Sequence, residues 1–303
     1  MSARHDSVAT LPVGTLPVGQ RWLITGASGM LGRDLQELLA ATPAVVTALS
    51  HTDLDVTDQI AVHAAVAGHD VVVNAAAFTR VDDAEVEVEA ATAVNATGAL
   101  NLAAASARAN ARLIQVSTDY VFDGTATEPY AESSPVSPLS VYGRSKAEGE
   151  QLALEAHPTG TVVLRTAWLY GAHGANFVSA VLGLAAKQPE ISVLTDQRGQ
   201  PTWTRDLAVR ILEVVAADIP PGIYHATNSG AASRFEFAQE IFRDAGLDPA
   251  RVTPLAGEGA PRPAPRPSYS VLGHDAWNRT ALAPLRPWAE ALAAAAAAGV
   301  LAS

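Results

Sequence analysis

A glycine-rich loop between a short apolar run and an amphipathic segment constrains the fold of this chain most. The loop reads Gly26-Ala27-Ser28-Gly29-Met30-Leu31-Gly32; it follows the apolar residues 22–25 and precedes a helical pattern over about 30–41. The first glycine permits a tight turn, the second lets the backbone approach a diphosphate, and the third lets the helix pack closely on the strand. This order predicts a dinucleotide site, with an ordinary glycine-rich turn as the alternative. The residues expected to contact the dinucleotide are Gly26, Ser28, Gly29, Met30, Leu31 and Gly32.

Apolar segments rich in β-branched residues recur along the chain, with helix-like segments between them. We expect strands at 22–25, 44–49, 71–74, 112–117 and 161–166, and a helix at 204–217 followed by a strand at 223–225 that returns to the same sheet. Strands that alternate with helices pair in parallel through right-handed crossovers. The sequence therefore predicts an α/β fold, a doubly wound parallel Rossmann sheet with a smaller C-terminal lobe that binds the substrate.

The predicted division of the chain follows from where this alternation stops. We expect a flexible leader over 1–20, a dinucleotide-binding domain over 21–170 plus about 203–226, and a substrate-binding domain over about 171–202 plus 227–303. The proline-rich segment 254–267 suits neither a helix nor a central strand and is expected to be a loop. An alanine-rich helix over 288–301 is expected to close the chain.

Composition excludes several classes of function. The chain has no cysteine, which rules out disulfides and thiolate chemistry, and its histidines are scattered, so we expect no metal site. A net charge of -11 without a basic run argues against nucleic-acid binding. No apolar stretch approaches the roughly 20 residues that span a bilayer, and the first 20 residues lack the pattern of a signal peptide. We therefore expect no membrane association and a cytoplasmic location.

Two further strand ends are candidates for contact with the dinucleotide. Asp55 and Val56 follow the second strand and are placed to flank an adenine, but Asp53 and Asp55 are equally well explained as turn and cap residues. An acid at this strand end would favour NADH and an arginine NADPH, and neither stands there directly. Because Arg33 follows closely behind the glycine loop, the choice between NADH and NADPH stays open. The small residues Ala75, Ala76 and Ala77 follow the third strand and leave room for a flat ligand, helix packing being the alternative.

A tyrosine and a lysine one helical turn apart supply the candidate chemistry. Tyr142 and Lys146 are four residues apart, so they share one face of a helix, and Thr118 with Asp119 ends the fourth strand. A nearby cation favours the phenolate and makes proton exchange by Tyr142 practical near neutral pH. Tyr142 would protonate a carbonyl oxygen as hydride reaches its carbon, while Thr118 hydrogen-bonds the same oxygen. A surface tyrosine with a solvated lysine is the alternative.

Eight ordered segments of the chain resemble the dTDP-4-dehydrorhamnose reductase family and its relatives that reduce 4-keto nucleotide sugars. The resemblance covers almost the whole chain from Arg21 to about Trp288, and the octet at 117–124 is the most specific segment. The segments are G-A-S-G-M-L-G at 26–32, N-A-A-A-F-T at 74–79, V-D-x-A-E at 81–85, S-T-D-Y-V-F-D-G at 117–124, Y-G-R-S-K-A-E-G-E at 142–150, R-T-A-W-L-Y-G at 165–171, G-A-N-F at 174–177 and D-Q-R-G-Q-P-T at 196–202.

The resemblance implies a role for each matching residue. Tyr142 resembles the proton donor, Lys146 its partner and a ligand of the cofactor ribose, and Ala75 to Ala77 line the cofactor. The residues that the resemblance places at the substrate are Thr118, Asp119, Trp168 on the sugar ring, Asn176 in G-A-N-F, and Arg262 and Arg266 on the proline-rich loop. The two arginines suit a diphosphate, and a solvated linker is the alternative.

Three departures or substitutions qualify this resemblance. Tyr120 stands where related 4,6-dehydratases carry a glutamate that expels water, so reduction fits better than elimination. Arg234 stands where relatives often place an aromatic residue, which bears on subunit or substrate contacts. The leader before Arg21 has no counterpart in the family.

The expected activity is reduction, by NADPH or NADH, of the 4-keto group of a dTDP-4-keto-6-deoxyhexose, which gives dTDP-L-rhamnose or a related deoxysugar. A reductase of an antibiotic deoxysugar pathway has the same motifs and is one alternative. A noncatalytic, dinucleotide-binding regulatory subunit of another enzyme is the other, although the presence of Thr118, Tyr142 and Lys146 together favours an enzyme. A homodimer is left open.

Overall fold

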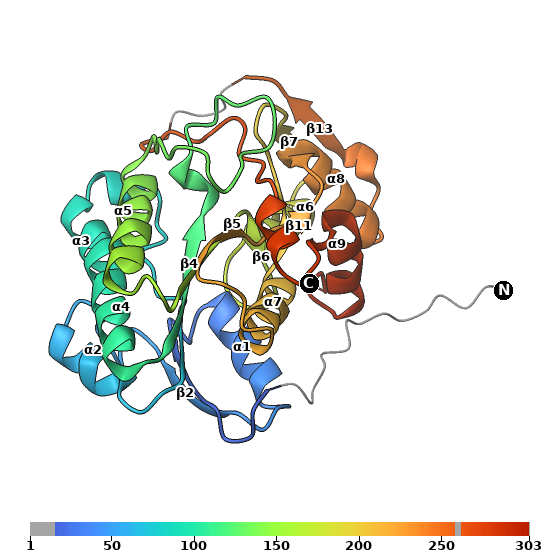
Figure 1. Cartoon of the computed structure of the whole chain (residues 1–303). Coiled ribbons are helices and arrows are strands. Elements are labelled where there is room, and N and C mark those ends of the chain that lie inside the picture. The colour runs from blue at the N-terminus through green and yellow to red at the C-terminus, as the bar shows by residue number, and fades with distance from the viewer. Residues whose placement is uncertain (1–15, 258–261, 303) are drawn as a thin grey trace.

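A six-stranded parallel sheet lies at the centre of the computed structural model, which describes residues 16–257 and 262–302 (Figure 1). The strand order is β10-β5-β4-β3-β1-β2, and every pairing in this sheet is parallel. The strands are β1 (Arg21–Thr25), β2 (Val45–Leu49), β3 (Val71–Asn74), β4 (Arg112–Thr118), β5 (Thr161–Thr166) and β10 (Gly222–His225). The helices are α1 (Met30–Leu39), α2 (Gln59–Val66), α3 (Val88–Thr92), α4 (Gly98–Ala109), α5 (Val141–Ala156), α6 (Phe177–Ala185), α7 (Thr204–Ala216), α8 (Arg234–Asp244) and α9 (Trp288–Ala297).

Alternate residues of each central strand face opposite layers of helices. Trp22 and Ile24 of β1 pack in the core that holds the buried side chains of α1 and α7, whereas Leu23 packs in the core that holds those of α2 and α4. In Figure 1, α1 and α7 accordingly lie on one side of the sheet and α2, α4 and α5 on the other. A strand covered on both faces carries apolar residues on both, which is why the middle of these strands reads as a short apolar run in the sequence. The predicted α/β fold with a parallel, doubly wound sheet is confirmed.

The connections reverse direction between β1 and β3. From β1 the chain passes outward to β2 and then crosses back to β3, after which β4, β5 and β10 extend the other half of the sheet. In open α/β sheets such a reversal leaves a crevice outside the carboxyl ends of the two strands, where ligands bind. The glycine loop follows β1, and Ala75 to Ala77 follow β3, so both flank this point.

A hydrophobic core among the C-terminal elements, called the C-terminal core below, is separate from the two cores on the sheet. Its buried side chains come mainly from α6, α8 and α9 and include Val178, Phe237, Ile241 and Leu292. Short paired strands surround it, namely β7 (Ile191–Leu194) with β13 (Val252–Leu255), β8 (Arg198–Gly199) with β12 (Ala232–Ser233), β6 (Leu169–Tyr170) with β9 (Thr202–Trp203), and β11 (Asn228–Ser229) with β14 (Leu285–Pro287). The predicted domain boundaries remain a prediction.

Three local expectations differ from the structure. Pro254 lies within β13, not in a loop, because this strand pairs only with β7 and the missing proline N–H can face away from the pair. The last helix ends at Ala297, near Gly299 with its φ of 83°. Leu16 is buried in the core beneath α1, so ordered structure begins before the predicted leader boundary; residues 1–15 of that leader lie outside the described residues.

The return of the later elements to the sheet is confirmed. Helix α7 packs against α1, and β10 pairs with β5 in register from Gly222 opposite Val162 to His225 opposite Arg165. Over residues 16–257 and 262–302, none of the helices has both the length and the apolar character needed to cross a membrane.

Candidate functional site

The glycine loop is shaped by contacts that only glycine allows. Gly26 has a φ of 68°, and a Cβ there would lie 2.5 Å from the carbonyl oxygen of Ala75. A Cβ on Gly32 would lie 2.5 Å from the oxygen of Gly26. Gly29 caps α1 without a side-chain hydrogen bond, and the first turn of α1 holds no acid. The N–H groups at this helix end are therefore open to an anion, and the loop fits the diphosphate of a dinucleotide.

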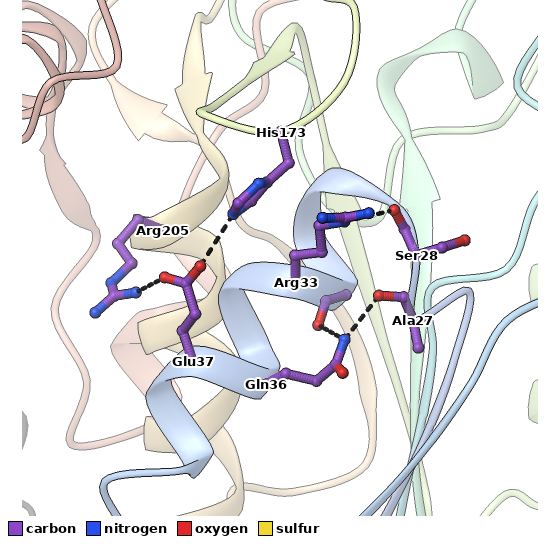
Figure 2. Close-up of polar contacts among 8 residues, drawn as sticks. Ala27, Ser28, Arg33, Gln36, Glu37, His173 and Arg205 are labelled. Carbon is purple, nitrogen blue, oxygen red and sulfur yellow. Dashed lines mark hydrogen bonds and ion pairs between the residues drawn. The ribbon is translucent and has the colours of Figure 1, made fainter.

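Two side chains of α1 fasten the loop from its outer side (Figure 2). Arg33 donates from Nε to the carbonyl oxygen of Ser28 at 3.1 Å. Gln36 donates from Nε2 to the oxygens of Ala27 at 2.7 Å and Gly32 at 2.9 Å. Backbone that is held in this way keeps its N–H groups oriented before any ligand arrives.

A line of buried polar side chains positions the segment after β3. Thr25 donates to Oδ1 of Asn74 at 2.8 Å, and Asn74 donates from Nδ2 to Oε1 of Gln115 at 2.8 Å. The same Asn74 oxygen accepts from the N–H of Ala76 at 3.1 Å. These bonds hold Ala75 to Ala77, which are all half-buried, beside Gly26 at the switch point. The structure thus places the predicted alanines next to the glycine loop.

The segment after β2 has a structural explanation of its own. Asp53 accepts from the N–H and hydroxyl of Ser50, and Asp55 accepts from the N–H and hydroxyl of Thr57, as in tight turns. Helix α2 is capped by Asp58, not by either of these. Val56 is buried in the core beneath α2 and α4. The turn interpretation therefore accounts for both acids, and adenine contacts by Asp55 and Val56 stay a prediction.

Thr118 and Tyr142 meet at the carboxyl end of β4. The Thr118 hydroxyl donates to Oδ1 of Asp119 at 3.0 Å and lies close enough to Tyr142 to oppose the rise of its pKa. Burial nonetheless raises the pKa of the Tyr142 phenol above its usual range, so the expected lowering by Lys146 is not seen in this structure. The ring of Tyr142 meets that of Tyr120 edge to face, with 5.6 Å between centroids. Burial also raises the pKa of Asp119 to about 6, against the hydroxyls of Ser270 and Thr118.

Lys146 lies beneath this pair on α5. Its Nζ donates to the carbonyl oxygen of Val116 at 2.6 Å, and burial lowers the pKa of its ammonium to about 8 despite the charge of Glu150. Glu150 in turn receives two hydrogen bonds from Nε and Nη2 of Arg165 on β5, at 3.0 and 2.7 Å. Sequence reasoning missed this buried ion pair, although both residues stand inside the motifs 142–150 and 165–171.

The start of α5 is fixed by an acid that sequence reasoning also left without a role. Oε1 of Glu85 accepts from the N–H of Val141 at 2.7 Å, and Ser140 caps the helix by accepting from the N–H of Gly143. Together they determine where Tyr142, the second residue of the helix, points. Glu85 closes the V-D-x-A-E segment at 81–85, so the motif itself was the available signal.

Trp168 is held in a conformation that is unusual for a large side chain. Its φ is 47°, in the left-handed region that seldom accepts bulky residues. The indole lies against Gly199, where a Cβ would come within 2.5 Å of the ring. Strained backbone of this kind persists where the surroundings enforce it, often at functional sites. Sugar contact by Trp168 stays a prediction.

The other predicted substrate residues have protein partners of their own. Asn176 caps α6, accepting from the N–H of Val178 at 3.0 Å and donating to the oxygen of Gly171 at 3.0 Å. Arg266 donates from Nη2 to Asp82 at 2.9 Å, and Asp82 also accepts from the N–H of Ala264 at 3.2 Å. This pair fastens the loop after residue 261 to the segment after β3. Arg262 is exposed.

A cluster of two acids and a histidine bears on the expectation that the chain has no metal site. Asp34 and Glu37 of α1 and His173 offer ligand atoms that all lie within 4.8 Å of one another. Glu37 already bonds His173 at 3.0 Å and Arg205 at 3.0 Å, as Figure 2 shows. These partners account for Glu37 without an ion.

A glycine loop at the switch point of a parallel sheet, beside a tyrosine and a lysine one turn apart, defines a dinucleotide-dependent oxidoreductase of the short-chain dehydrogenase type. Residues 20–300 match the family described as the RmlD substrate binding domain. The chain belongs to this family, which confirms the resemblance drawn from the sequence motifs.

Individual relatives agree with this assignment. The chain is 54% identical to the "probable dTDP-4,6-dihydroxy-2-methyloxan-3-one 4-ketoreductase" of Streptomyces antibioticus, over 90% of this chain and 93% of that one. It is 50% identical to a dTDP-4-dehydrorhamnose reductase of Streptomyces griseus, over 90% and 91% of the two chains. A crystal structure of dTDP-4-dehydrorhamnose reductase from Bacillus anthracis in complex with NADP superposes with a TM-score of 0.87 at 37% identity, over 91% and 98%.

Proposed function

We propose that this protein reduces the 4-keto group of a dTDP-4-keto-6-deoxy-L-hexose, with NADPH or NADH as the reductant. The observation that carries the proposal is the proximity of Thr118 to the half-buried Tyr142 at the carboxyl end of β4, next to the loops that flank the switch point. The names of the relatives from Streptomyces griseus and Streptomyces antibioticus support the substrate class.

The chain provides the parts of a dinucleotide site. The loop 26–32 would hold the diphosphate, Ala75 to Ala77 would line the flat rings, and Lys146 would bind the ribose. When bound, the cofactor supplies hydride to the carbonyl carbon. Arg33 is exposed, and within the described part of the chain its side chain donates only from Nε, to Ser28. Its terminal nitrogens can therefore receive a 2′-phosphate, which favours NADPH; the Bacillus anthracis relative was solved with NADP.

Side chains of the protein then donate one proton to the carbonyl oxygen of the substrate. Because burial raises the pKa of Tyr142, the phenol keeps its proton at neutral pH and can give it to the carbonyl oxygen as that oxygen becomes negative. The Thr118 hydroxyl would hold the same oxygen in place. Lys146 lies one helical turn after Tyr142, and the carbonyl oxygen of Val116 positions its Nζ. Tyr120 stands where related 4,6-dehydratases carry a glutamate, so Asp119 has no second carboxylic acid beside it to help expel water, and reduction is favoured.

For the diphosphate of the substrate we propose Arg262 and Arg266. Arg262 is exposed, whereas Arg266 already shares Nη2 with Asp82, so Arg266 would place the loop as well as contribute charge. Trp168 would pack on the sugar ring and Asn176 would lie near it through its place at the start of α6. A homodimer and a cytoplasmic location remain predictions from the sequence.

The test is to mix the protein with NADPH or NADH and dTDP-4-keto-6-deoxy-L-mannose and to follow the loss of nicotinamide absorbance. Tyr142→Phe should lower turnover by roughly 10²- to 10⁴-fold and leave cofactor binding intact. Tyr224→Phe, which removes a phenol bonded to Pro220 away from the site, is the matched control and should remain active. Cofactor binding without turnover by the unaltered protein would instead support a noncatalytic regulatory subunit.

A reductase of an antibiotic deoxysugar pathway is the second candidate. The 54% identity to the Streptomyces antibioticus 4-ketoreductase favours it. The configuration of the product at the reduced carbon, determined by NMR, would separate dTDP-L-rhamnose from an epimeric product. This measurement distinguishes the two products without depending on which residues carry the chemistry.

A further inference from the structure

Arg234 occupies a position that helix stability does not explain. It is the first residue of α8, where the helix dipole disfavours a cation. Its guanidinium carbon lies 3.5 Å from the centroid of the Trp168 ring and 5.0 Å from that of Phe177. Stacking of a guanidinium on an aromatic face offsets the unfavourable dipole and fixes the plane of the group.

The stacked guanidinium keeps its donors for another molecule. Among residues 16–257 and 262–302, no side chain or carbonyl accepts a hydrogen bond from the Arg234 guanidinium, in contrast to Arg266, which bonds Asp82. A guanidinium that stacks through its face presents its N–H groups at the edge, in a plane suited to two oxygens of one anion. The strained Trp168 and its close contact with Gly199 hold the platform in place.

The charge around Arg234 attracts an anion. Burial lowers the pKa of Arg234 to about 10, against the influence of Tyr120 and Asp119, and Arg262 and Arg266 lie near enough to lower it further. Asp119 is the acid that faces this group, but its Oδ2 is buried without a hydrogen-bond partner among the described residues and its own pKa is raised. In a chain with a net charge of -11, this gathering of arginines leaves a local excess of positive charge beside Thr118 and Tyr142.

We propose that Arg234 binds the diphosphate of the nucleotide sugar through the edge of its guanidinium, with the Trp168 indole as its platform. The inference rests on the proposed function and adds a recognition residue to it. A sugar hydroxyl would need one neutral hydrogen-bond partner, whereas three converging arginines match a ligand with two negatively charged phosphates.

The test measures ligand binding by the full chain, without turnover. Calorimetric titrations with dTDP and with thymidine compare the unaltered protein, Arg234→Met, Arg234→Lys and the control Arg243→Met. Arg243 lies on the same helix and pairs with Glu240 at the surface. Arg234→Met should weaken dTDP binding by about 10- to 100-fold, the loss expected for a charge-assisted hydrogen bond, and leave thymidine binding unchanged. Arg234→Lys, which keeps the charge and loses the planar fork, should show an intermediate loss.

Kinetics provide a second readout. In Arg234→Met the KM for the nucleotide sugar should rise by a similar factor, while kcat and the Kd for NADPH stay within a few-fold of the unaltered protein. Equal losses for dTDP and thymidine would mean that Arg234 only supports Trp168, and this would overturn the proposal, as would unchanged dTDP binding. If Arg234→Met fails to fold, an unchanged dTDP affinity in Arg234→Lys overturns it.

Failure of the proposed function gives a different result. An unaltered protein that binds dTDP through Arg234 but reduces no 4-keto sugar would leave the diphosphate contact standing and refute the reductase. If the unaltered protein reduces the sugar and Arg234→Met leaves its KM unchanged, the reductase stands and the diphosphate contact is refuted.

Discussion

The buried ion pair beneath the catalytic helix allows a stability prediction of defined size. The side chains of Glu150 and Arg165 are only 4% and 2% exposed, and two hydrogen bonds join them. Glu150→Gln removes the charge and keeps the shape, so it leaves the guanidinium of Arg165 buried without a counter-charge. Breaking a buried pair by removing one partner typically costs about 3–5 kcal/mol. That is a large share of the roughly 5–15 kcal/mol that holds a typical protein folded.

The size of this loss translates into a melting temperature. Unfolding entropy of roughly 2.1 cal/mol/K per residue gives about 0.6 kcal/mol/K for 303 residues. Glu150→Gln should therefore lower Tm by about 5–8 °C in differential scanning calorimetry at pH 7. The control is Glu155→Gln on the exposed side of the same helix, where Glu155 accepts from Gln151 and the change should stay within about 0.5 kcal/mol.

A double variant separates the lost charge from lost packing. Glu150→Met together with Arg165→Met removes both charges and fills the space with apolar atoms, so it should recover at least half of the Tm lost by Glu150→Gln. A loss below about 1 kcal/mol in the single variant would refute the assignment of a desolvated pair. A double variant no more stable than the single one would show that the hydrogen bonds, not the unpaired charge, account for the loss.

Three other outcomes are expected. Gly26→Ala should abolish NADPH binding in fluorescence titrations, because its Cβ would strike the Ala75 carbonyl, whereas Gly183→Ala, with open space at the Cβ, should bind normally. Asp119→Asn should raise the free energy of unfolding by on the order of 3 kcal/mol at pH 7 and change it little at pH 4. The reason is that the pKa of Asp119 in the folded protein, about 6, exceeds the ordinary 3.8, so the unaltered protein loses stability as pH rises between these values. Asp82→Asn should raise the KM for the nucleotide sugar more than the Kd for NADPH, because the loop that carries Arg262 and Arg266 loses its ionic anchor; equal changes in both would contradict this.

The central sheet was predictable because its strands are covered on both faces. Residues 71–74 and 161–166 are buried throughout, and each contains an apolar run, Val71 to Val73 and Val162 to Leu164, between helical patterns. The short strands around the C-terminal core have no such apolar run in the sequence. Two-residue strands such as Arg198–Gly199 have no periodicity, and the proline in Val252–Leu255 argued against a strand that lies at an edge.

The sequence predicted those parts of the site whose residues lie within a single motif. Tyr142 and Lys146 share a helix, and the glycine loop is contiguous. Arg266 and Asp82 are separated by 184 residues, and only the folded chain brings them together. The direction of the Tyr142 pKa shift was also beyond the motif, since it depends on burial by surrounding elements and not on the lysine four residues away.

The polar line through Thr25, Asn74 and Gln115 bears on how the chain finds its fold. It joins three adjacent parallel strands through partners 49 and 41 residues apart, contacts that form only after long segments have closed. A strand that paired one residue out of step would bury these polar side chains without partners, at about 1–3 kcal/mol for each group. The residues that hold the cofactor loop in place thus also penalise misaligned strands.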